Sequence, residues 1–421
     1  MAVFTYAVRY WITAVCVTPL RSGGVDGDPD AVLRDRDGRA FLQGTSLAGA
    51  LRGWLDRIDA AGAKALFGYP EHSGHLVLSD GLFEPESMSQ IRPRLRIDGA
   101  SGTADRGGKF DVAHIAAGSK FSFSLTWMAT KTDEKELELV EKLLAAVHHG
   151  EIRFGAQKTN GFGRVTLAVK KQTYDLTNTA GRAAWMDDRE QGTPLELPEA
   201  WKETQTVFTL HGHVDSILIK AAAAEHSGTG SWIGNLTENG VPILPGSSIK
   251  GAVRERAEGI ARLLGLNRGV TDRIFGRAAE GNDNGIQGLV SFEDVRLSGE
   301  KQKITRIRID KFTGGVFRGG LFQEEPMCSN IVLRITVPTG QPVACALLTY
   351  ALRDLGLGLY SLGSGGAIGR GYVGVEKIVA QTPDQGCGTL CFHGDGACTV
   401  DDPDGLFGHW SDALEELRDE T

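Results

Sequence analysis

Residues 243–254 read Ile-Leu-Pro-Gly-Ser-Ser-Ile-Lys-Gly-Ala-Val-Arg and combine a sharp turn with the start of a helix. Pro245 and Gly246 are typical turn residues, and the apolar spacing that follows predicts a helix. The first N–H groups of such a helix have no partner within it, and the positive end of the helix dipole favours a phosphate or another anion. Ordinary helix capping by Ser247 or Ser248 explains a single copy of this turn equally well.

A second copy of this turn occupies residues 41–52, which read Phe-Leu-Gln-Gly-Thr-Ser-Leu-Ala-Gly-Ala-Leu-Arg. Other signatures also occur twice in the same order: a Phe-Gly pair, a strand ending in Asp, an Arg-x-Arg-Ile-Asp strand and a glycine-rich motif. The copies lie roughly 200–215 residues apart, as expected for duplication of a whole domain. Within each copy the pattern reads strand, helix, strands, helix, strand. The predicted fold class is α+β, with two tandem ferredoxin-like (RRM-like) βαββαβ domains.

The duplication also predicts the domain boundaries. The first domain is expected over residues 1–170 and the second over residues 206–380. Residues 171–205 lack a hydrophobic period and contain prolines and charges, so they are interpreted as a linker. Residues 381–421 are expected to form a C-terminal tail, with a short acidic helix that docks on a partner.

Composition and charge limit the class of protein. A length of 421 residues is comfortable for two domains. The net charge of −8 argues against a non-specific coat on nucleic acid, although a local basic groove stays possible. No apolar run approaches the ~18 residues that span a bilayer, and no signal-peptide layout occurs. Six cysteines at irregular spacing indicate reduced thiols. A cytoplasmic protein without a membrane partner is expected.

The two glycine turns are not nucleotide-binding P-loops. A Walker sequence places Lys and Ser/Thr directly after its second glycine, whereas Gly251 and Gly49 are both followed by apolar residues. A backbone-donor site for a phosphodiester remains, with an arginine about two turns into each helix. The candidate contacts at the turns are Gly44, Thr45, Ser46, Arg52, Gly246, Ser247, Ser248, Lys250 and Arg254.

The glycine-rich motif reads Gly-Phe-Gly-Arg at residues 161–164 and Gly-Arg-Gly-Tyr at residues 369–372. Its glycines permit the close approach of another backbone. A tight turn before the last strand explains one copy. Paired with the helix turn, and present twice, the motif predicts a groove that follows a nucleic-acid backbone. Its candidate contacts are Lys158, Gly161, Gly163, Arg164, Gly369, Arg370 and Gly371.

The order of these signatures resembles the RAMP proteins, the backbone subunits of type III CRISPR effector complexes. The resemblance covers about residues 1–170 and 206–380, and it is closest to a tandem fusion of two backbone subunits, as in type III-D-like complexes. It implies a guide-RNA-binding backbone subunit of an antiviral ribonucleoprotein. The partners it implies are the guide RNA, a target single-stranded RNA, and other backbone, small and large subunits.

The resemblance also implies a thumb hairpin in each domain that interrupts the guide–target duplex. The segments assigned to thumbs are residues 99–111 and 311–325. Arg106 and Phe110 in the first, and Phe317 and Arg318 in the second, suit a wedge that displaces bases. A plain surface loop is the alternative interpretation.

In catalytic members of the family, an aspartate in the loop before the glycine turn cleaves target RNA with a divalent metal. Asp30 fits that pattern best and Asp28 second. A carboxylate there could hold Mg²⁺ or Mn²⁺ and orient the 2′-hydroxyl. The matching loop at residues 226–235 has no aspartate, so the second domain is expected to bind RNA without cutting. The chain is thus predicted to be a metal-dependent endoribonuclease acting on guide-paired target RNA, unless the first loop is only a solvated turn.

Three other functions stay open at this point. The chain could be a purely structural backbone subunit, with cleavage done by its neighbours. It could be a guide-processing nuclease that uses metal-free acid–base chemistry, although no convincing histidine or tyrosine/lysine constellation occurs near the glycine turn. It could also be a duplicated ferredoxin-like protein that binds a ligand other than RNA.

The C-terminal tail contains four residues of types that bind zinc: Cys387, Cys391, His393 and Cys398. Structural zinc sites usually include a paired C-x-x-C, and none occurs here. A loop-like tail with free thiols is therefore favoured over a zinc site.

Overall fold

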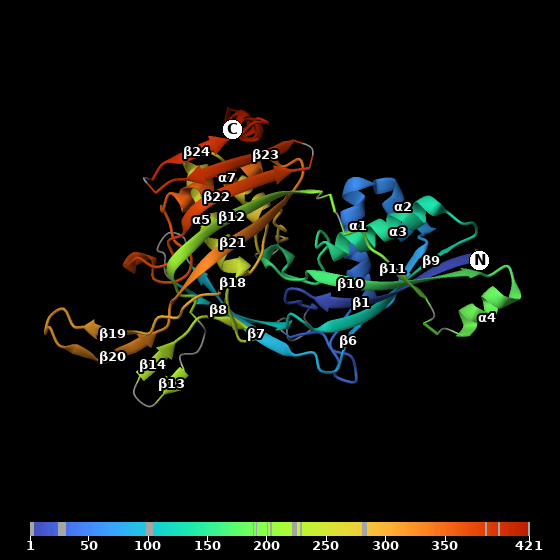
Figure 1. Cartoon of the computed structure of the whole chain (residues 1–421), viewed down its shortest axis with the longest axis horizontal. Coiled ribbons are helices and arrows are strands. Elements are labelled where there is room, and N and C mark those ends of the chain that lie inside the picture. Colours follow the sequence, from blue (N-terminus) through green and yellow to red (C-terminus); the bar gives the residue numbers. More distant parts are fainter. Residues whose placement is uncertain are drawn as a thin grey trace. The chain divides into compact units, whose positions relative to one another are not determined.

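The computed structural model forms two compact units (Figure 1). Residues 1–95, 106–158 and 162–202 make up the first unit, and residues 96–105, 159–161 and 203–421 the second. Each unit has its own buried apolar core. The structure describes residues 4–23, 31–97, 104–187, 189–190, 192–199, 201–202, 204–220, 225–227, 230–279, 284–383, 385–394 and 396–419.

The sheet of the first unit is built on β1 (Tyr6–Cys16). β1 pairs antiparallel with β10 (Val165–Asp175) on one side and with β9 (Lys120–Ala129) on the other. Short strands continue the sheet beyond β9, namely β5 (Leu76–Leu78), β6 (Gly81–Phe83) and β2 (Phe41–Leu42). The fourth, first, third and second strands of the repeat therefore lie side by side, which is the ferredoxin-like order.

Three helices of the first unit lie on one face of this sheet (Figure 1). They are α1 (Gly44–Ile58), α2 (Ala60–Phe67) and α3 (Glu134–His148). Leu47, Leu51 and Leu55 of α1 are buried, and the apolar spacing seen in the sequence is thereby confirmed. None of the helices in the described part of the chain is long and apolar enough to cross a membrane.

The second unit repeats this arrangement. Its central strand β12 (Gln205–Ile217) pairs antiparallel with β21 (Met327–Pro338) and β22 (Gly374–Thr382), and β17 (Ser291–Phe292) pairs with β21. Three helices, α5 (Gly246–Leu263), α6 (Arg268–Phe275) and α7 (Pro342–Gly356), contribute buried residues to the core. The predicted fold class of two tandem ferredoxin-like domains is confirmed.

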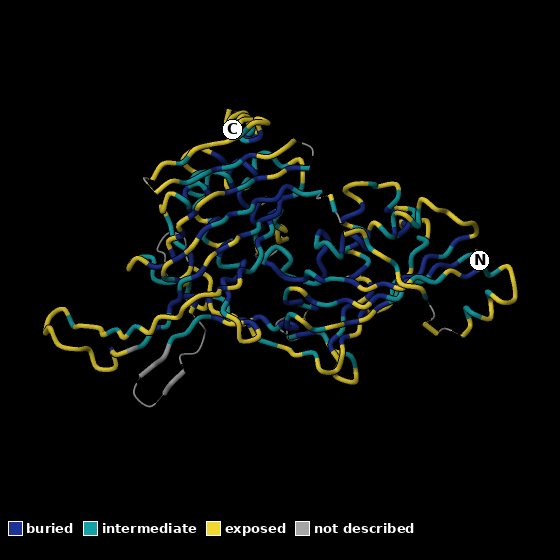
Figure 2. The backbone as a smooth tube through the Cα atoms, viewed as in Figure 1, coloured by how far each residue is buried: buried dark blue, intermediate teal, exposed yellow. Residues whose placement is uncertain are grey.

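Each repeat carries a long hairpin inserted before its third strand. The first hairpin consists of β7 (Ser89–Ile97) and β8 (Ala104–Ile115), and the second of β19 (Ile304–Ile309) and β20 (Val316–Glu324). The strand β14 (Gly230–Ile233) adds to β20 in parallel and pairs with β13 (Glu225–Ser227). The β19–β20 hairpin is exposed along most of its length (Figure 2). The remaining short elements are β3 (Gly68–Tyr69), β4 (His72–Ser73), β15 (Thr237–Glu238), β16 (Val241–Leu244), β18 (Val295–Arg296) and the 3-10 turns η1 (Lys158–Asn160) and η2 (Gly366–Ile368).

The segment expected to be a linker is largely part of the first unit. β10 continues to Asp175, α4 (Thr179–Asp187) follows, and β11 (Thr193–Leu195) pairs with β10 at the sheet edge. Leu195, Leu197 and Trp201 pack against the core. These apolar residues are too few and too widely spaced to show the hydrophobic period of a helix or strand. Their packing is nevertheless enough to fix the segment on the core of the first unit.

The C-terminal tail is likewise an integral part of the second unit rather than a loop. Strands β23 (Gly386–Phe392) and β24 (Cys398–Asp401) extend the sheet beyond β22. The helix α8 (Leu406–Asp419) buries Leu406, Trp410 and Leu414 in the same core as α7. The acidic helix expected near the end therefore docks on its own chain, because its apolar stripe covers α7.

Truncation of one α8 leucine tests this integration. Leu414 is 3% exposed, so Leu414→Ala is expected to lower the free energy of unfolding by about 2–5 kcal/mol. Leu263 on α5 is 85% exposed, and Leu263→Ala should change it by less than about 0.5 kcal/mol. Urea denaturation of the full chain measures both. Equal effects of the two substitutions would contradict the packing of α8.

Candidate nucleic-acid interface

At the first glycine turn, the first backbone N–H of α1 donates a hydrogen bond to a carboxylate. The Gly44 N–H donates to Asp80 Oδ1 at 2.7 Å, while Gln43 at the N-cap makes no side-chain capping bond. A Cβ on Gly44 would lie 2.8 Å from the Leu78 carbonyl oxygen. Glycine is therefore required because α1 begins against the backbone that leads to Asp80.

The second turn has the same construction. The Gly246 N–H donates to Asp294 Oδ1 at 2.7 Å, and Pro245 is the N-cap without a side-chain capping bond. A Cβ on Gly246 would collide with the Phe292 carbonyl oxygen. Serine capping, the alternative raised by the sequence, is not the arrangement in either copy.

Asp80 and Asp294 are site residues that the sequence did not assign. Both end the repeated strand that precedes the hairpin, and this shared position was the available signal. Their carboxylates occupy the first N–H of each helix, which leaves less of the helix terminus for a bound anion. The hydroxyl residues beside them differ in exposure: Thr45 and Ser46 are exposed, and Ser247 and Ser248 are half-buried.

In the first repeat, the glycine-rich motif ties the last strand to the end of β1. The Gly163 N–H donates to the Pro19 carbonyl at 2.8 Å, and the Gly163 carbonyl accepts from Phe154 N–H at 2.9 Å. The Ala156 N–H donates to the Arg21 carbonyl at 2.8 Å. Gly163 has φ +86° and a Cβ there would collide with the Phe154 carbonyl, so only glycine fits.

The second repeat forms the same set of bonds. The Gly371 N–H donates to the Ser216 carbonyl at 2.8 Å, and its carbonyl accepts from Leu362 N–H at 2.8 Å. The Ser364 N–H donates to the Leu218 carbonyl at 2.8 Å. Gly161 and Gly369, the other predicted glycines, have φ of +91° and +84°. The motif therefore has the same geometry in both repeats, with close backbone contact in each.

The predicted catalytic loop begins and ends beside this motif. The Leu33 N–H donates to Ser22 Oγ at 3.0 Å, and Ser22 is 1% exposed. Ser22 follows Pro19, whose carbonyl accepts from Gly163 of the glycine-rich motif, and Arg21, whose carbonyl accepts from Ala156, so the base of the loop is fixed there. Asp28 and Asp30 themselves lie outside the described residues.

The two helix arginines of the predicted site differ in their surroundings. Arg52 is half-buried and forms an ion pair with Asp56 at 3.5 Å. Arg254 donates to Glu258 at 2.6 Å, Asp272 at 3.0 Å and a backbone carbonyl at 2.7 Å. Arg254 therefore joins α5 to α6, whereas Arg52 keeps its charge near the surface. Lys250, one turn into α5, is half-buried.

Arg370 supports the base of the second hairpin. Its Nη1 donates to Glu324 Oε2 at 2.6 Å, and Arg306 donates to the same oxygen at 3.2 Å. Arg370 is 6% exposed and Glu324 is 2% exposed. The sequence favoured Arg370 as a phosphate ligand, but its guanidinium is committed to this buried carboxylate.

In the first repeat, Phe162 stands at the position of Arg370. Its ring is fully buried beneath two hairpin arginines, with the Arg92 and Arg94 guanidinium carbons 4.7 Å and 5.5 Å from the ring centroid. Arg94 also donates to Gln157 Oε1 at 2.8 Å. Both repeats thus anchor a basic hairpin strand on the glycine-rich motif, one by an ion pair and one by cation–π contacts.

Lys158 lies in a positively charged surrounding just before the motif. Burial lowers the pKa of Lys158, and the nearby charge of Arg57 lowers it further. Arg164 follows Gly163, is half-buried, and its backbone N–H donates to Thr18 Oγ1 at 3.0 Å.

The four predicted wedge residues lie on the second strand of each hairpin. Arg106 and Phe110 are exposed on β8, and Phe317 and Arg318 are exposed on β20. The Arg308 guanidinium carbon lies 5.0 Å from the Phe317 ring centroid. Exposed aromatic rings beside arginines are suited to stacking on bases, and this role stays a prediction.

No group of three or more His, Cys, Asp or Glu side chains that could hold a metal occurs among the described residues. In the tail, Phe392 pairs with Cys398 and Cys391 with Thr399. Since successive strand residues point to opposite faces, Cys391 and Cys398 point away from one another. The tail cysteines are therefore not assembled into a common site.

Acid pH tests the buried ion pair of the second hairpin. Burial raises the pKa of Glu324, but hydrogen bonds from Arg370 and Arg306 outweigh burial and hold it below its ordinary value of 4.5. A lowered folded-state pKa contributes stability above the ordinary pKa, and this contribution is lost as the pH falls through the folded-state pKa. Glu324→Gln should therefore be less stable than wild type at pH 7, with the difference shrinking below about pH 4.5.

Thermal unfolding across pH 3–7 measures this difference, with Glu376→Gln, an exposed glutamate on β22, as the control. A pH-independent difference between wild type and Glu324→Gln would show that Glu324 is not ionised in the folded protein.

Comparison with known proteins agrees with this geometry. The RAMP superfamily matches residues 13–166 and 229–374, one segment in each repeat. A similar protein is the CRISPR system Cms endoribonuclease Csm3 of Methanocaldococcus jannaschii, which is 26% identical over 176 residues covering 35% of this chain and 68% of that protein. Both the matched segments and the repeated fold lead to one assignment: the chain belongs to the RAMP superfamily.

Proposed function

We propose that this chain is a guide-RNA-binding backbone subunit of a type III CRISPR antiviral ribonucleoprotein. The observation that carries the proposal is the duplicated site, in which each repeat joins a glycine helix turn, a glycine-rich motif and an exposed hairpin. Membership of the RAMP superfamily and the likeness to a CRISPR endoribonuclease support it. Other subunits and a target single-stranded RNA are the partners that follow from this function.

The predicted cationic contacts of the two repeats have different surroundings. In the first repeat, Lys158 and Arg164 lie on either side of the motif glycines, and Arg52 is half-buried on α1. In the second, Arg254 and Arg370 are engaged by carboxylates of the same unit. These two arginines therefore offer less charge to a phosphodiester backbone than the sequence alone indicates.

Target cleavage is assigned to the loop of the first repeat. Asp30, with Asp28 as the second choice, would hold Mg²⁺ or Mn²⁺ and orient the attacking 2′-hydroxyl. The support is indirect: the loop base is fixed beside the glycine-rich motif, next to the expected path of the RNA. The loop of the second repeat lacks aspartate, so that repeat would bind without cutting.

Removal of two cations tests RNA binding. Lys158→Gln combined with Arg164→Gln should weaken guide-RNA binding and reduce the slope of log K against log salt by about 0.7 per lost phosphate contact. Lys142→Gln, an exposed lysine on α3, is the charge-matched control for a single substitution. Fluorescence anisotropy with labelled RNA over a salt series gives both slopes. If the slope is unchanged in the double variant, Lys158 and Arg164 do not contact RNA phosphates.

Substitution of the loop aspartate tests catalysis in the assembled complex. Asp30→Ala should slow cleavage of guide-paired target RNA by at least about 10²-fold, as should EDTA, while guide RNA stays bound. Asp37→Ala is the control, because Asp37 is exposed in the next turn and pairs with Arg36. If target RNA is still cut at every position, the subunit is a structural backbone and its neighbours do the cutting.

A further inference from the structure

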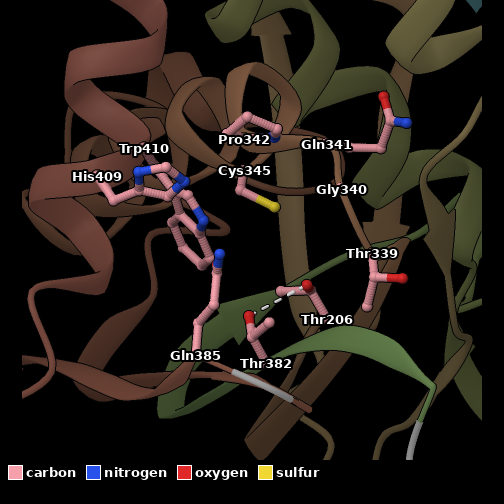
Figure 3. A pocket seen from close by; sticks show the side chains of 10 residues that line it. All are labelled: Thr206, Thr339, Gly340, Gln341, Pro342, Cys345, Thr382, Gln385, His409 and Trp410. Atoms are coloured by element: carbon pink, nitrogen blue, oxygen red, sulfur yellow. Dashed lines mark hydrogen bonds between the residues drawn. The ribbon is translucent and has the colours of Figure 1, made fainter.

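In the second unit, cavities lie at both ends of α7, the helix that packs against α5 and α8. The cavity at the N-terminal end has a volume of about 150 Å³, and the hydroxyl oxygens of Thr206 and Thr382 in its wall lie 3.2 Å apart (Figure 3). The cavity nearer the C-terminal end is larger, about 280 Å³, and arginine side chains line it. This larger cavity, the α7 groove, therefore has the charges that can select a ligand.

The α7 groove has an apolar wall on either side of α7. Ile260 and Leu263 on α5, with Leu264 just after it, form one wall, and Leu414 on α8 contributes to the other. Leu414 is buried, whereas Leu263 is exposed, so the groove has a closed apolar floor and an open apolar edge. An alkyl group bound there would leave water, which favours binding. None of the described residues that line the groove belongs to the predicted RNA contacts, so the site is separate from the proposed function.

Two arginines of the α7 groove share one buried carboxylate. Asp354 on α7 is 1% exposed. Its Oδ2 accepts from Arg256 Nε at 2.6 Å, and its Oδ1 accepts from Arg353 Nη2 at 2.8 Å. Both arginines are half-buried, so water screens their charges only in part. Two guanidinium groups on a single carboxylate leave one positive charge uncompensated in this cluster.

The other charged residues of the α7 groove do not change this balance. Glu415 and Arg418 both line it from α8, and both are exposed. One is an acid and the other a base, so the lining as a whole also has one positive charge in excess. Arg418 pairs with Asp419 at 2.9 Å, but Asp419 is exposed outside the groove, where water and salt weaken its effect.

A comparable cluster in the same unit has equal numbers of both charges. Asp272 accepts from Arg254 at 3.0 Å and lies 3.7 Å from Arg277, and Glu258 accepts from Arg254 at 2.6 Å. Two arginines therefore meet two carboxylates there. Each guanidinium has five N–H donors, more than a shared carboxylate can engage. Relative to this balanced cluster, the cluster around Asp354 has room for a second carboxylate.

We propose that the α7 groove binds a small amphiphilic carboxylate, such as a medium-chain fatty acid. The carboxylate accepts hydrogen bonds from Arg256 and Arg353. The alkyl chain lies against Ile260, Leu264 and Leu414. One uncompensated positive charge favours a monoanion, and the apolar walls favour an alkyl group over a bare inorganic anion. The volume equals that of about nine water molecules, which limits the ligand to about ten heavy atoms.

Isothermal titration calorimetry of the full-length protein with sodium octanoate tests the site. Octanoate should bind saturably, with one molecule per chain. Acetate lacks the alkyl chain and octanol lacks the charge, so each should bind at least about tenfold more weakly. Binding of octanol equal to that of octanoate overturns the role of the arginines. Octanoate binding that does not saturate, or binding of inorganic phosphate with none of octanoate, overturns the proposal.

Substitution of one arginine locates the binding in the α7 groove. Arg353→Gln leaves Asp354 its bond from Arg256 and removes the uncompensated charge, so the affinity for octanoate should fall at least about tenfold. Arg262→Gln, at an exposed arginine of α5 outside the groove, is the matched control and should bind octanoate as wild type does.

A second variant keeps the test valid if Arg353→Gln is unstable. Leu263→Glu changes an exposed side chain at the edge of the groove, so the fold should be retained. The added carboxylate repels that of octanoate and removes part of the apolar wall, so the affinity should again fall. Wild-type affinity for octanoate in either folded variant contradicts the proposed site.

Discussion

The close backbone contact at Gly163 and Gly371 is the constraint on which each repeat depends. A positive φ and the space of a single hydrogen let the motif bond to the end of the repeat's first strand. That contact sets the start of the last strand, the base of the loop that follows the first strand, and the foot of the hairpin. A side chain at either glycine would separate all three from the sheet.

The two repeats share this frame but differ in the residues that fill it. Phe162 under two arginines anchors the first hairpin, and the Arg370–Glu324–Arg306 cluster anchors the second. The same position therefore carries a hydrophobic ring in one copy and a buried charge in the other. In the second repeat this buried ion pair engages Arg370, whereas the aspartate-containing loop belongs to the first repeat. Duplication followed by divergence of sequence is the simplest account.

Most of the fold could be predicted from the sequence because the chain repeats its own signals. The period-two pattern of β1 and the apolar stripe of α1 are both observed. Residues 171–205 and 381–421 give no periodic signal, since Leu195, Trp201 and Trp410 are isolated in sequence and are recognisable as core residues only in the folded chain. The glycine turns of the site were found, but their aspartate partners were not, because Asp80 and Asp294 lie 36 and 48 residues away.

The sequence by itself determined the duplication, the ferredoxin-like order and the place of the glycine motifs, because these depend on local pattern and on repetition along the chain. Only the tertiary structure decided which charges are available. Arg370 and Arg254 read as phosphate ligands in the sequence, yet folding brings carboxylates to both. It also brought two arginines to one buried carboxylate beside an apolar groove. Such neighbours are set by the packing of distant segments, which no local pattern records.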